Sequence, residues 1–161
     1  MWQDAGFLSG KPDSKMAMKQ LAHFIETIPA KYQAFNEEAL LQYPAPGKWS
    51  KKQVLGHLID SAINNLKRFT DMQCTPSPYI VQRYQQNELV AINNYQQLPL
   101  DHLLLLWQAI NRQIIFVVEN TPAEKLHLPV DAGYADRQLK TLAWLVADYV
   151  AHMAHHWKQV F

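Results

Sequence analysis

The last part of the chain has the repeat of a helix that buries one face, and three histidines lie within it. With about 100° assigned to each residue, one apolar stripe forms, made of Leu142, Leu145, Val146, Tyr149, Met153 and Val160. His156 falls within this stripe and His152 at its edge, whereas His155 projects away from it. Since other elements have to cover such a stripe, we expect two of the three histidines to point inward.

The spacing of His152 and His156 is that of a metal-binding pair. Residues four apart lie one above the other on a helix face, and two neutral imidazoles so placed can hold one ion, as in the HExxH motif. Two other interpretations stay open. The pair could be core histidines bonded to neighbours, or the segment could be a solvated helix end, where the helix dipole favours cations.

The clearest helix start in the chain lies at residues 50–53. Ser50 and Gln53 have the spacing of a capping box, and Trp49 and Val54 are placed for a hydrophobic staple. The helix is expected to run to about Gln73, where a Pro-rich stretch stops it.

His57 lies on this helix but not on its main apolar stripe. It shares a second, polar strip with Ser61, Asn64 and Arg68. From this helix alone a solvated face is the favoured interpretation, and the alternative is a strip that lines an interior site.

Three further segments carry a helical repeat. The first begins near Asp13 or Ser14, is kinked or restarted at Pro29, and continues to about residue 41. The others run from about residue 101 to 119, apolar nearly all round and so expected to be deeply buried, and from about Gln138 to the end. Short helical pieces are predicted near residues 88–95 and 121–124. The pattern predicts an all-α four-helix bundle, in which sites form between facing helices.

Length and composition limit the function. The 161 residues suit one domain, residues 1–161, with residues 1–12 as a loose N-terminal arm. A net charge of +1 gives no electrostatic case for nucleic acid, and the longest apolar runs are too short to span a bilayer. A single cysteine, Cys74, excludes an internal disulfide framework. No signal peptide is visible, so a cytoplasmic protein is expected.

Several of these motifs together resemble one known family. The Pro46–Ser50 helix start, His57 about two turns later, and the HxxxHxxQ pattern of His152, His156 and Gln159 are similar to the DinB/YfiT-like superfamily. The resemblance covers about residues 28–161. It implies a four-helix bundle of up-down-down-up type, with a long connection between helices 2 and 3. It also implies that His57, His152 and His156 bind a divalent metal ion, zinc or nickel, which reverses the solvated interpretation of His57.

Three imidazole ligands leave a coordination position for water or substrate, which is the catalytic pattern. The resemblance implies a metal-dependent hydrolase or thiol transferase acting on a small molecule, with a low-molecular-weight thiol as a candidate partner and a homodimer as the expected assembly. The alternative is a non-catalytic metal-binding or stress-response bundle. No nucleophile motif or phosphate loop is present.

Four more residues are candidates for the surroundings of the metal or for substrate contact: Tyr149, Asp148, Asn64 and Ser61. Asp148 stands one turn before His152 and could accept its second N–H, but its angle suits a surface contact with His155 or Lys158 equally well. Tyr149 shares the stripe of the histidines and could reach a substrate, although a buried tyrosine with a satisfied hydroxyl is the more common situation.

Overall fold

A computed structural model describes residues 14–133 and 138–161. The loose arm expected at residues 1–12 lies outside the described residues. The predicted four-helix bundle is confirmed. Its long helices are α1 (Ser14–Gln33), α3 (Lys51–Asp71), α5 (Leu100–Glu119) and α6 (Leu142–Val160).

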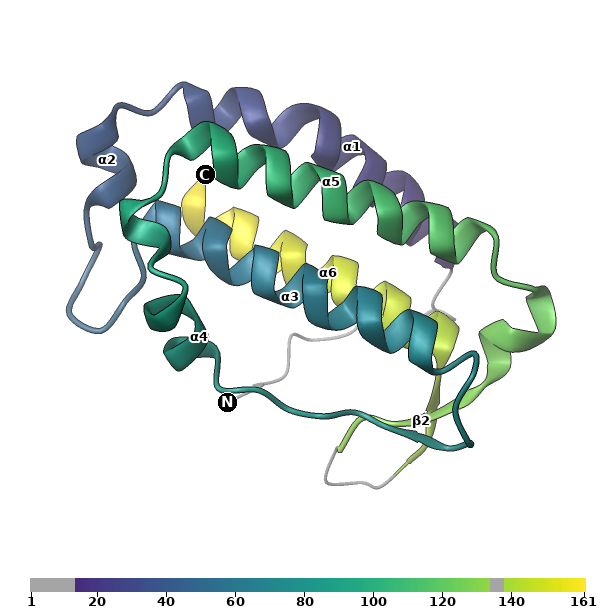
Figure 1. Cartoon of the computed structure of the whole chain (residues 1–161). Helices are drawn as coiled ribbons and strands as arrows, with labels where there is room; N and C mark the ends of the chain where they lie inside the picture. Colours follow the sequence, from purple (N-terminus) through teal and green to yellow (C-terminus); the bar gives the residue numbers. More distant parts are fainter. Residues whose placement is uncertain (1–13, 134–137) are drawn as a thin grey trace.

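The four helices run up, down, down and up (Figure 1). The ends of α1 and α6 meet, since the Tyr32 and Trp157 rings pack edge to face at 5.8 Å. The ends of α3 and α5 meet as well, because Gln73 Nε2 donates to Thr121 Oγ1 (3.2 Å). Parallel neighbours such as α3 and α5 need a long connection. It contains α4 (Gln86–Ile92) and the 3₁₀ helix η1 (Tyr95–Gln97), close to the predicted short helix.

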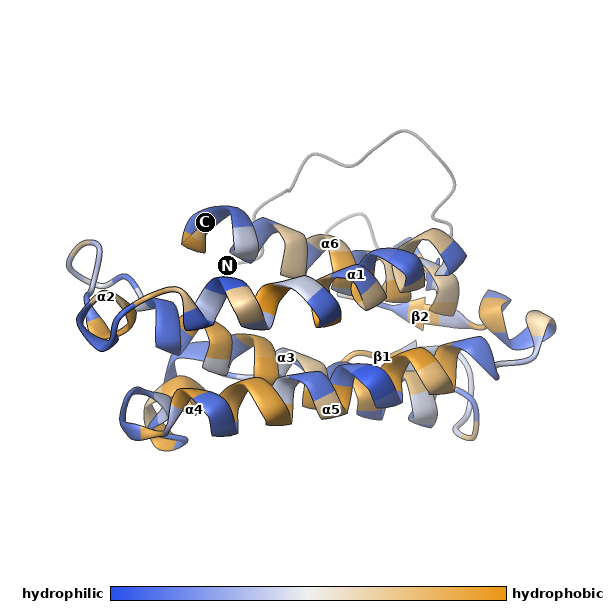
Figure 2. Cartoon of the chain, turned by 90° about the horizontal axis from the view of Figure 1, so that it is seen from above, coloured by the Kyte–Doolittle hydropathy of each residue, from blue (hydrophilic) through white to orange (hydrophobic). Residues whose placement is uncertain are grey.

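The interior is filled by large side chains from all four helices, and polar and apolar residues alternate along each of them (Figure 2). Trp107, Tyr32, Tyr149 and Phe69 are the largest fully buried ones. The prediction that the third long helix is buried all round is wrong. Leu105 and Phe116 are 65% and 63% exposed, because α1 and α3 cover only part of the surface of α5.

Local capping determines where the helices begin. Gln53 N donates to Ser50 Oγ and Ser50 N to Gln53 Oε1, both at 3.1 Å, so the predicted capping box is present. Pro29 does not end the first helix. The break comes later, where Asn36 Oδ1 accepts from Ala39 N (2.8 Å) and starts α2 (Glu37–Leu41).

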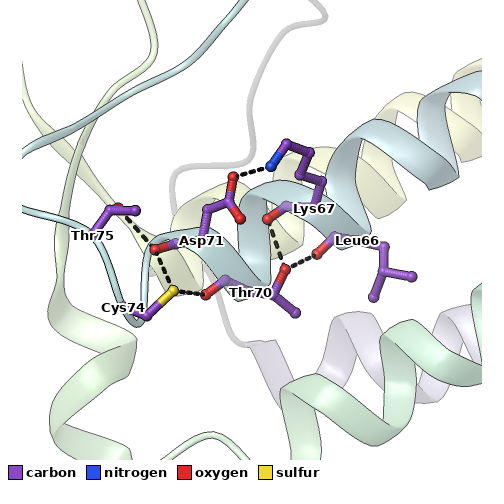
Figure 3. A network of polar contacts seen from close by, with 6 residues as sticks. All are labelled: Leu66, Lys67, Thr70, Asp71, Cys74 and Thr75. Carbon is purple, nitrogen blue, oxygen red and sulfur yellow. Dashed lines mark hydrogen bonds and ion pairs between the residues drawn. The ribbon is translucent and has the colours of Figure 1, made fainter.

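Side chains satisfy the last carbonyls of α3 (Figure 3). Thr75 Oγ1 donates to the Asp71 carbonyl (2.8 Å), and Thr70 Oγ1 to the Leu66 carbonyl (3.0 Å). Lys67 and Asp71 form an ion pair one turn apart (2.7 Å). The helix ends at Asp71, two residues before the predicted end near Gln73.

A small sheet closes one end of the bundle, and no sequence signal had indicated it. β1 (Tyr79–Ile80) pairs in parallel with β2 (Pro129–Asp131), and β2 pairs antiparallel with β3 (Lys140–Thr141). The last helix therefore begins at Leu142 and not near Gln138, because residues 140–141 bond to β2 and Thr141 Oγ1 accepts from Trp144 N (3.2 Å). A 3₁₀ turn, η2 (Ala123–His127), follows the predicted Thr-Pro start. Within the described ranges, every helix is too short or too polar to cross a bilayer.

Candidate metal centre

Three histidines from two facing helices converge inside the bundle. His57 lies in the second turn of α3 and is fully buried, while His152 and His156 lie in the last turns of α6. His152 Nε2 lies 3.4 Å from His57 Nε2 and 3.0 Å from His156 Nε2. One nitrogen of each ring lies within 4.8 Å of the other two. The structure thus brings together the three predicted histidines.

His155 lies outside this cluster. It is exposed, and its Nε2 is 2.9 Å from Gln159 Nε2 on the next turn. The difference from His156 follows from the helical period, because adjacent positions are rotated by about 100°.

The environment keeps the three clustered rings neutral at pH 7. Burial, together with the charge that His156 would carry, lowers the pKa of His57 to about 3. Burial and the neighbouring His155 lower the pKa of His156 to about 4. The pKa of His152 falls well below its usual range, chiefly through burial and then through His156 and His57. Neutral imidazoles have free lone pairs, which metal binding requires.

Two of the three distances between the nitrogens match those expected around one shared ion, and the third is at most 4.8 Å. Three nitrogens bound tetrahedrally at about 2.0–2.1 Å would lie about 3.3 Å from each other, close to the 3.0 and 3.4 Å found here. Hydrogen bonds explain the cluster less well. His152 Nε2 in a neutral ring is either a single donor or a single acceptor, so it cannot pair well with both neighbours.

Trp49 covers one side of the cluster. The half-buried indole lies 4.6 Å from the His57 ring and 6.3 Å from the His156 ring, between centroids. The sequence predicts only a hydrophobic staple for Trp49. The Nδ1 atoms of His57 and His156 are buried and have no hydrogen-bond partner among the residues described. Aromatic packing, and not a carboxylate, therefore holds these two rings.

Asp148 is buried, so the surface contact suggested by its angle is wrong. It lines a cavity that His152 also borders. Burial raises its pKa to about 6, against the opposing effect of Arg68. A helical wheel of α6 alone cannot show this burial, because Val81, Arg83, Tyr84 and Gln86, from a distant part of the sequence, line the same cavity.

The other candidates divide between the interior and the surface. Tyr149 lines the same cavity, but its hydroxyl donates to Asn111 Oδ1 (2.5 Å) and is satisfied there. Ser61 is buried one turn after His57 and lies 3.4 Å from Asn65 Nδ2. Asn64 is turned away: it donates to the Asp60 carbonyl (2.8 Å) and borders a different surface groove. Its neighbour Asn65 lines the cavity in its place.

A second buried carboxyl group, Asp60, ties the long connection to α3. Its Oδ1 accepts from Tyr95 Oη (2.6 Å) and Asn93 Nδ2 (2.8 Å). Burial raises the pKa of Asp60, and these two bonds oppose the rise. The Tyr95 ring packs directly against Gly56, the residue before His57. This contact was not predicted, since Gly56 gave no signal beyond its small size.

Known proteins are similar to this chain in sequence or in fold. A family model described as the DinB superfamily matches residues 15–160. A protein of Halalkalibacterium halodurans named "Putative metal-dependent hydrolase" is 22% identical over 144 residues, which are 89% of this chain and 82% of that protein.

Two solved structures are similar in fold. YfiT from Bacillus subtilis, described as "a probable metal-dependent hydrolase with an unusual four-helix bundle topology", has a TM-score of 0.79 and 17% identity, with 96% of this chain and 87% of that chain covered. A mycothiol-dependent maleylpyruvate isomerase has a TM-score of 0.65 and 14% identity, with coverages of 89% and 60%.

Proposed function

The chain belongs to the DinB superfamily, and from this premise we propose that it is a metal-dependent enzyme that acts on a small molecule. His57, His152 and His156 are the proposed ligands of one divalent ion. The observation that carries the proposal is the convergence of three neutral imidazoles, one buried and two partly buried, inside the bundle.

Three protein ligands suit a catalytic site, because a closed structural site has four. When bound, a divalent ion supplies Lewis-acid chemistry: it lowers the pKa of a water or thiol at the remaining position towards neutrality. The protein's own part is to keep the imidazoles neutral by burial and to hold two of them against Trp49. Zinc and nickel are the ions we expect, because both bind imidazole well.

Hydrolysis and thiol transfer are the two reaction types that such a site supports. The names of the Halalkalibacterium and Bacillus proteins favour hydrolysis. The fold shared with a mycothiol-dependent isomerase favours a low-molecular-weight thiol as cosubstrate. A turnover screen with the metal-loaded protein separates them, since hydrolysis needs no added thiol and thiol transfer requires one.

The metal ligands are tested by comparing His156→Ala with His155→Ala. Protein purified without a nickel column should contain about one divalent ion per chain in the parent and in His155→Ala. His156→Ala should lose most of its metal, because two remaining histidines hold an ion weakly. Metal content by mass spectrometry and metal titration of the apoprotein measure this. Metal-dependent turnover should disappear with the ion.

Thermal melting in a chelator is the control for folding. His156→Ala removes a partly exposed ring, so the metal-free variant should stay helical and melt cooperatively. An equal loss of metal in both variants would overturn the ligand assignment. A parent that takes up no divalent ion would overturn the enzyme proposal altogether and favour a non-catalytic bundle.

A further inference from the structure

A cavity is lined by residues of α3 and α6, of the connection after β1, and of the stretch after β2. It has a volume of about 50 Å³, and His152 forms part of its wall. Its polar lining comes from three separate parts of the chain and includes Asn65, Arg68, Arg83, Tyr84 and Asp148. This volume holds a few waters or one small polar group.

Arg68 is the unusual residue in this wall. Its side chain is buried, with only 6% of the residue exposed. Nη2 donates to the Gln82 carbonyl (2.8 Å), and Nη1 makes a long contact with Asn65 Oδ1 (3.4 Å). The guanidinium lies 5.8 Å from the centre of the Tyr84 ring. A guanidinium has five N–H donors, so these contacts leave most of them unused.

No carboxylate neutralises Arg68 within hydrogen-bonding distance. Across residues 14–133 and 138–161, the ion pairs within 4.0 Å are Lys52–Glu37 and Lys67–Asp71. Asp148 is close enough to influence Arg68 electrostatically but does not pair with it. Buried arginines are almost always paired. A buried guanidinium that lines a cavity without a carboxylate partner therefore suits a ligand with a negative charge.

Arg83 adds a second positive charge at the edge of the cavity. It is exposed, and its Nη2 donates to the Gly133 carbonyl (2.7 Å). Two arginines therefore face a single carboxyl group, Asp148, around the cavity.

We propose that this cavity binds a carboxylate group of the substrate through Arg68, while the reacting end of the same molecule lies at the three histidines. The inference rests on the proposed function and adds a substrate class: an elongated small molecule with a terminal carboxylate. A planar guanidinium matches a carboxylate with two parallel hydrogen bonds. Asp148 then faces the bound carboxylate from α6.

The required length of the substrate follows from the separation of His57 and Arg68 along α3. Arg68 comes eleven residues after His57, which is about 16 Å of helix rise. Its side chain leans back towards the start of α3, as long helical side chains do, and its contact with Asn65 agrees with this direction. The carboxylate and the reacting atom are then separated by about 10 Å, so a two- or three-carbon acid is too short.

A thiol carboxylate can measure this distance without any turnover. In cobalt-loaded protein the thiolate binds the metal and changes its visible absorption, so binding can be titrated. The probes are 8-mercaptooctanoate, the neutral 8-mercapto-1-octanol, and the short 3-mercaptopropionate. The parent should bind the long acid at least 10-fold more tightly than the long alcohol, as expected for a charge-assisted hydrogen bond. The short acid should show no such gain.

Arg68→Gln should remove the preference for the long acid while leaving the affinity for the alcohol unchanged. The unchanged alcohol affinity, with an unchanged melting curve, shows that the variant folds and holds its metal. Arg83→Gln is the matched control and should reduce the preference by about 2- to 3-fold, as for an exposed charge pair. Asp148→Asn should strengthen binding of the acid, because it removes the competing negative charge.

A parent that binds acid and alcohol equally, or an Arg68→Gln variant that keeps the preference, would overturn the carboxylate site and leave the metal proposal intact. If the parent binds no cobalt, the metal proposal fails instead. Hexanoate binding to metal-free protein, followed by NMR, then still tests the cavity. Shifts in the parent that are absent in Arg68→Gln support the carboxylate site, and equal shifts in both contradict it.

Discussion

Replacing Gly56 by alanine tests how the long connection holds the part of α3 that carries His57. A Cβ atom at position 56 would lie 2.1 Å from Tyr95 Cδ2, 2.2 Å from Cγ and 2.7 Å from Cβ. Because the Tyr95 Cβ itself is too close, rotation of the ring cannot relieve the clash. Either η1 or α3 has to move.

Three effects determine the change in the free energy of unfolding. One stabilises the protein and two destabilise it. Alanine is favoured over glycine within a helix by about 0.8–1.0 kcal/mol. Overpacking of the core costs about 1–3 kcal/mol. Displacing η1 also breaks the bond from Tyr95 Oη to Asp60, and a hydrogen bond to a charged group contributes about 1.5–3 kcal/mol. The net loss of unfolding free energy should be roughly 2–5 kcal/mol, since the packing and hydrogen-bond losses exceed the gain in propensity.

Urea unfolding of the metal-free protein, in a double-mutant cycle with Tyr95→Gly, measures this effect. In the Tyr95→Gly background all three close atoms are absent, so Gly56→Ala should be neutral or should stabilise by up to about 1 kcal/mol. Cobalt affinity of Gly56→Ala should fall as well, because His57 is the next residue. A Gly56→Ala protein more stable than the parent, or the same change in both backgrounds, would refute the packing argument.

Two further perturbations test the helix start and the buried histidines. Ser50→Ala should lower the free energy of unfolding in urea by about 1–3 kcal/mol. This exceeds an ordinary N-cap loss of about 1 kcal/mol, because Ser50 Oγ also donates to Gln96 Oε1 at 2.6 Å. Ser50→Thr should retain most of this stability. In metal-free protein the folded-state pKa of about 3 for His57 and about 4 for His156 lies below the unfolded value of 6.5, so the unfolded chain binds more protons between these values. This contribution to stability is complete above pH 6.5 and is lost as the pH falls towards 4, by up to about 1.4 kcal/mol per pH unit for each histidine. His57→Phe should have a shallower pH dependence of unfolding free energy than the parent over this interval, and equal slopes would contradict the assigned pKa values.

The long helices and the capped start of α3 could be predicted because their causes are local. The capping box joins Ser50 to Gln53, three residues away, and its hydrogen bonds form within one turn. The outward position of His155 follows from the same short period, since only the angle between neighbours on one helix is needed. Angular positions on single helices, however, could not show that His57 faces the other two histidines. The family resemblance was needed for that expectation.

The errors concern positions whose surroundings come from distant parts of the sequence. The helix angle of Asp148 leaves a contact with His152 and a surface contact equally open. The structure buries this residue beside a cavity that Arg83 and Tyr84 also line. The last helix begins late because β3 pairs with β2, and Leu105 is exposed because α5 has neighbours on only part of its surface. None of these partners can be inferred from a hydrophobic repeat, which describes one element at a time.

The amino-acid sequence by itself determined the all-α class, the capped start of α3 and the facing of the two histidines on α6, because each depends on residues within a few positions of one another. Only the tertiary structure decided that His57 meets that pair, that Trp49 covers the cluster, and that Arg68 is buried beside a cavity without a charged partner. Burial and charge pairing are properties of groups brought together from distant positions, so they exist only once the bundle has formed.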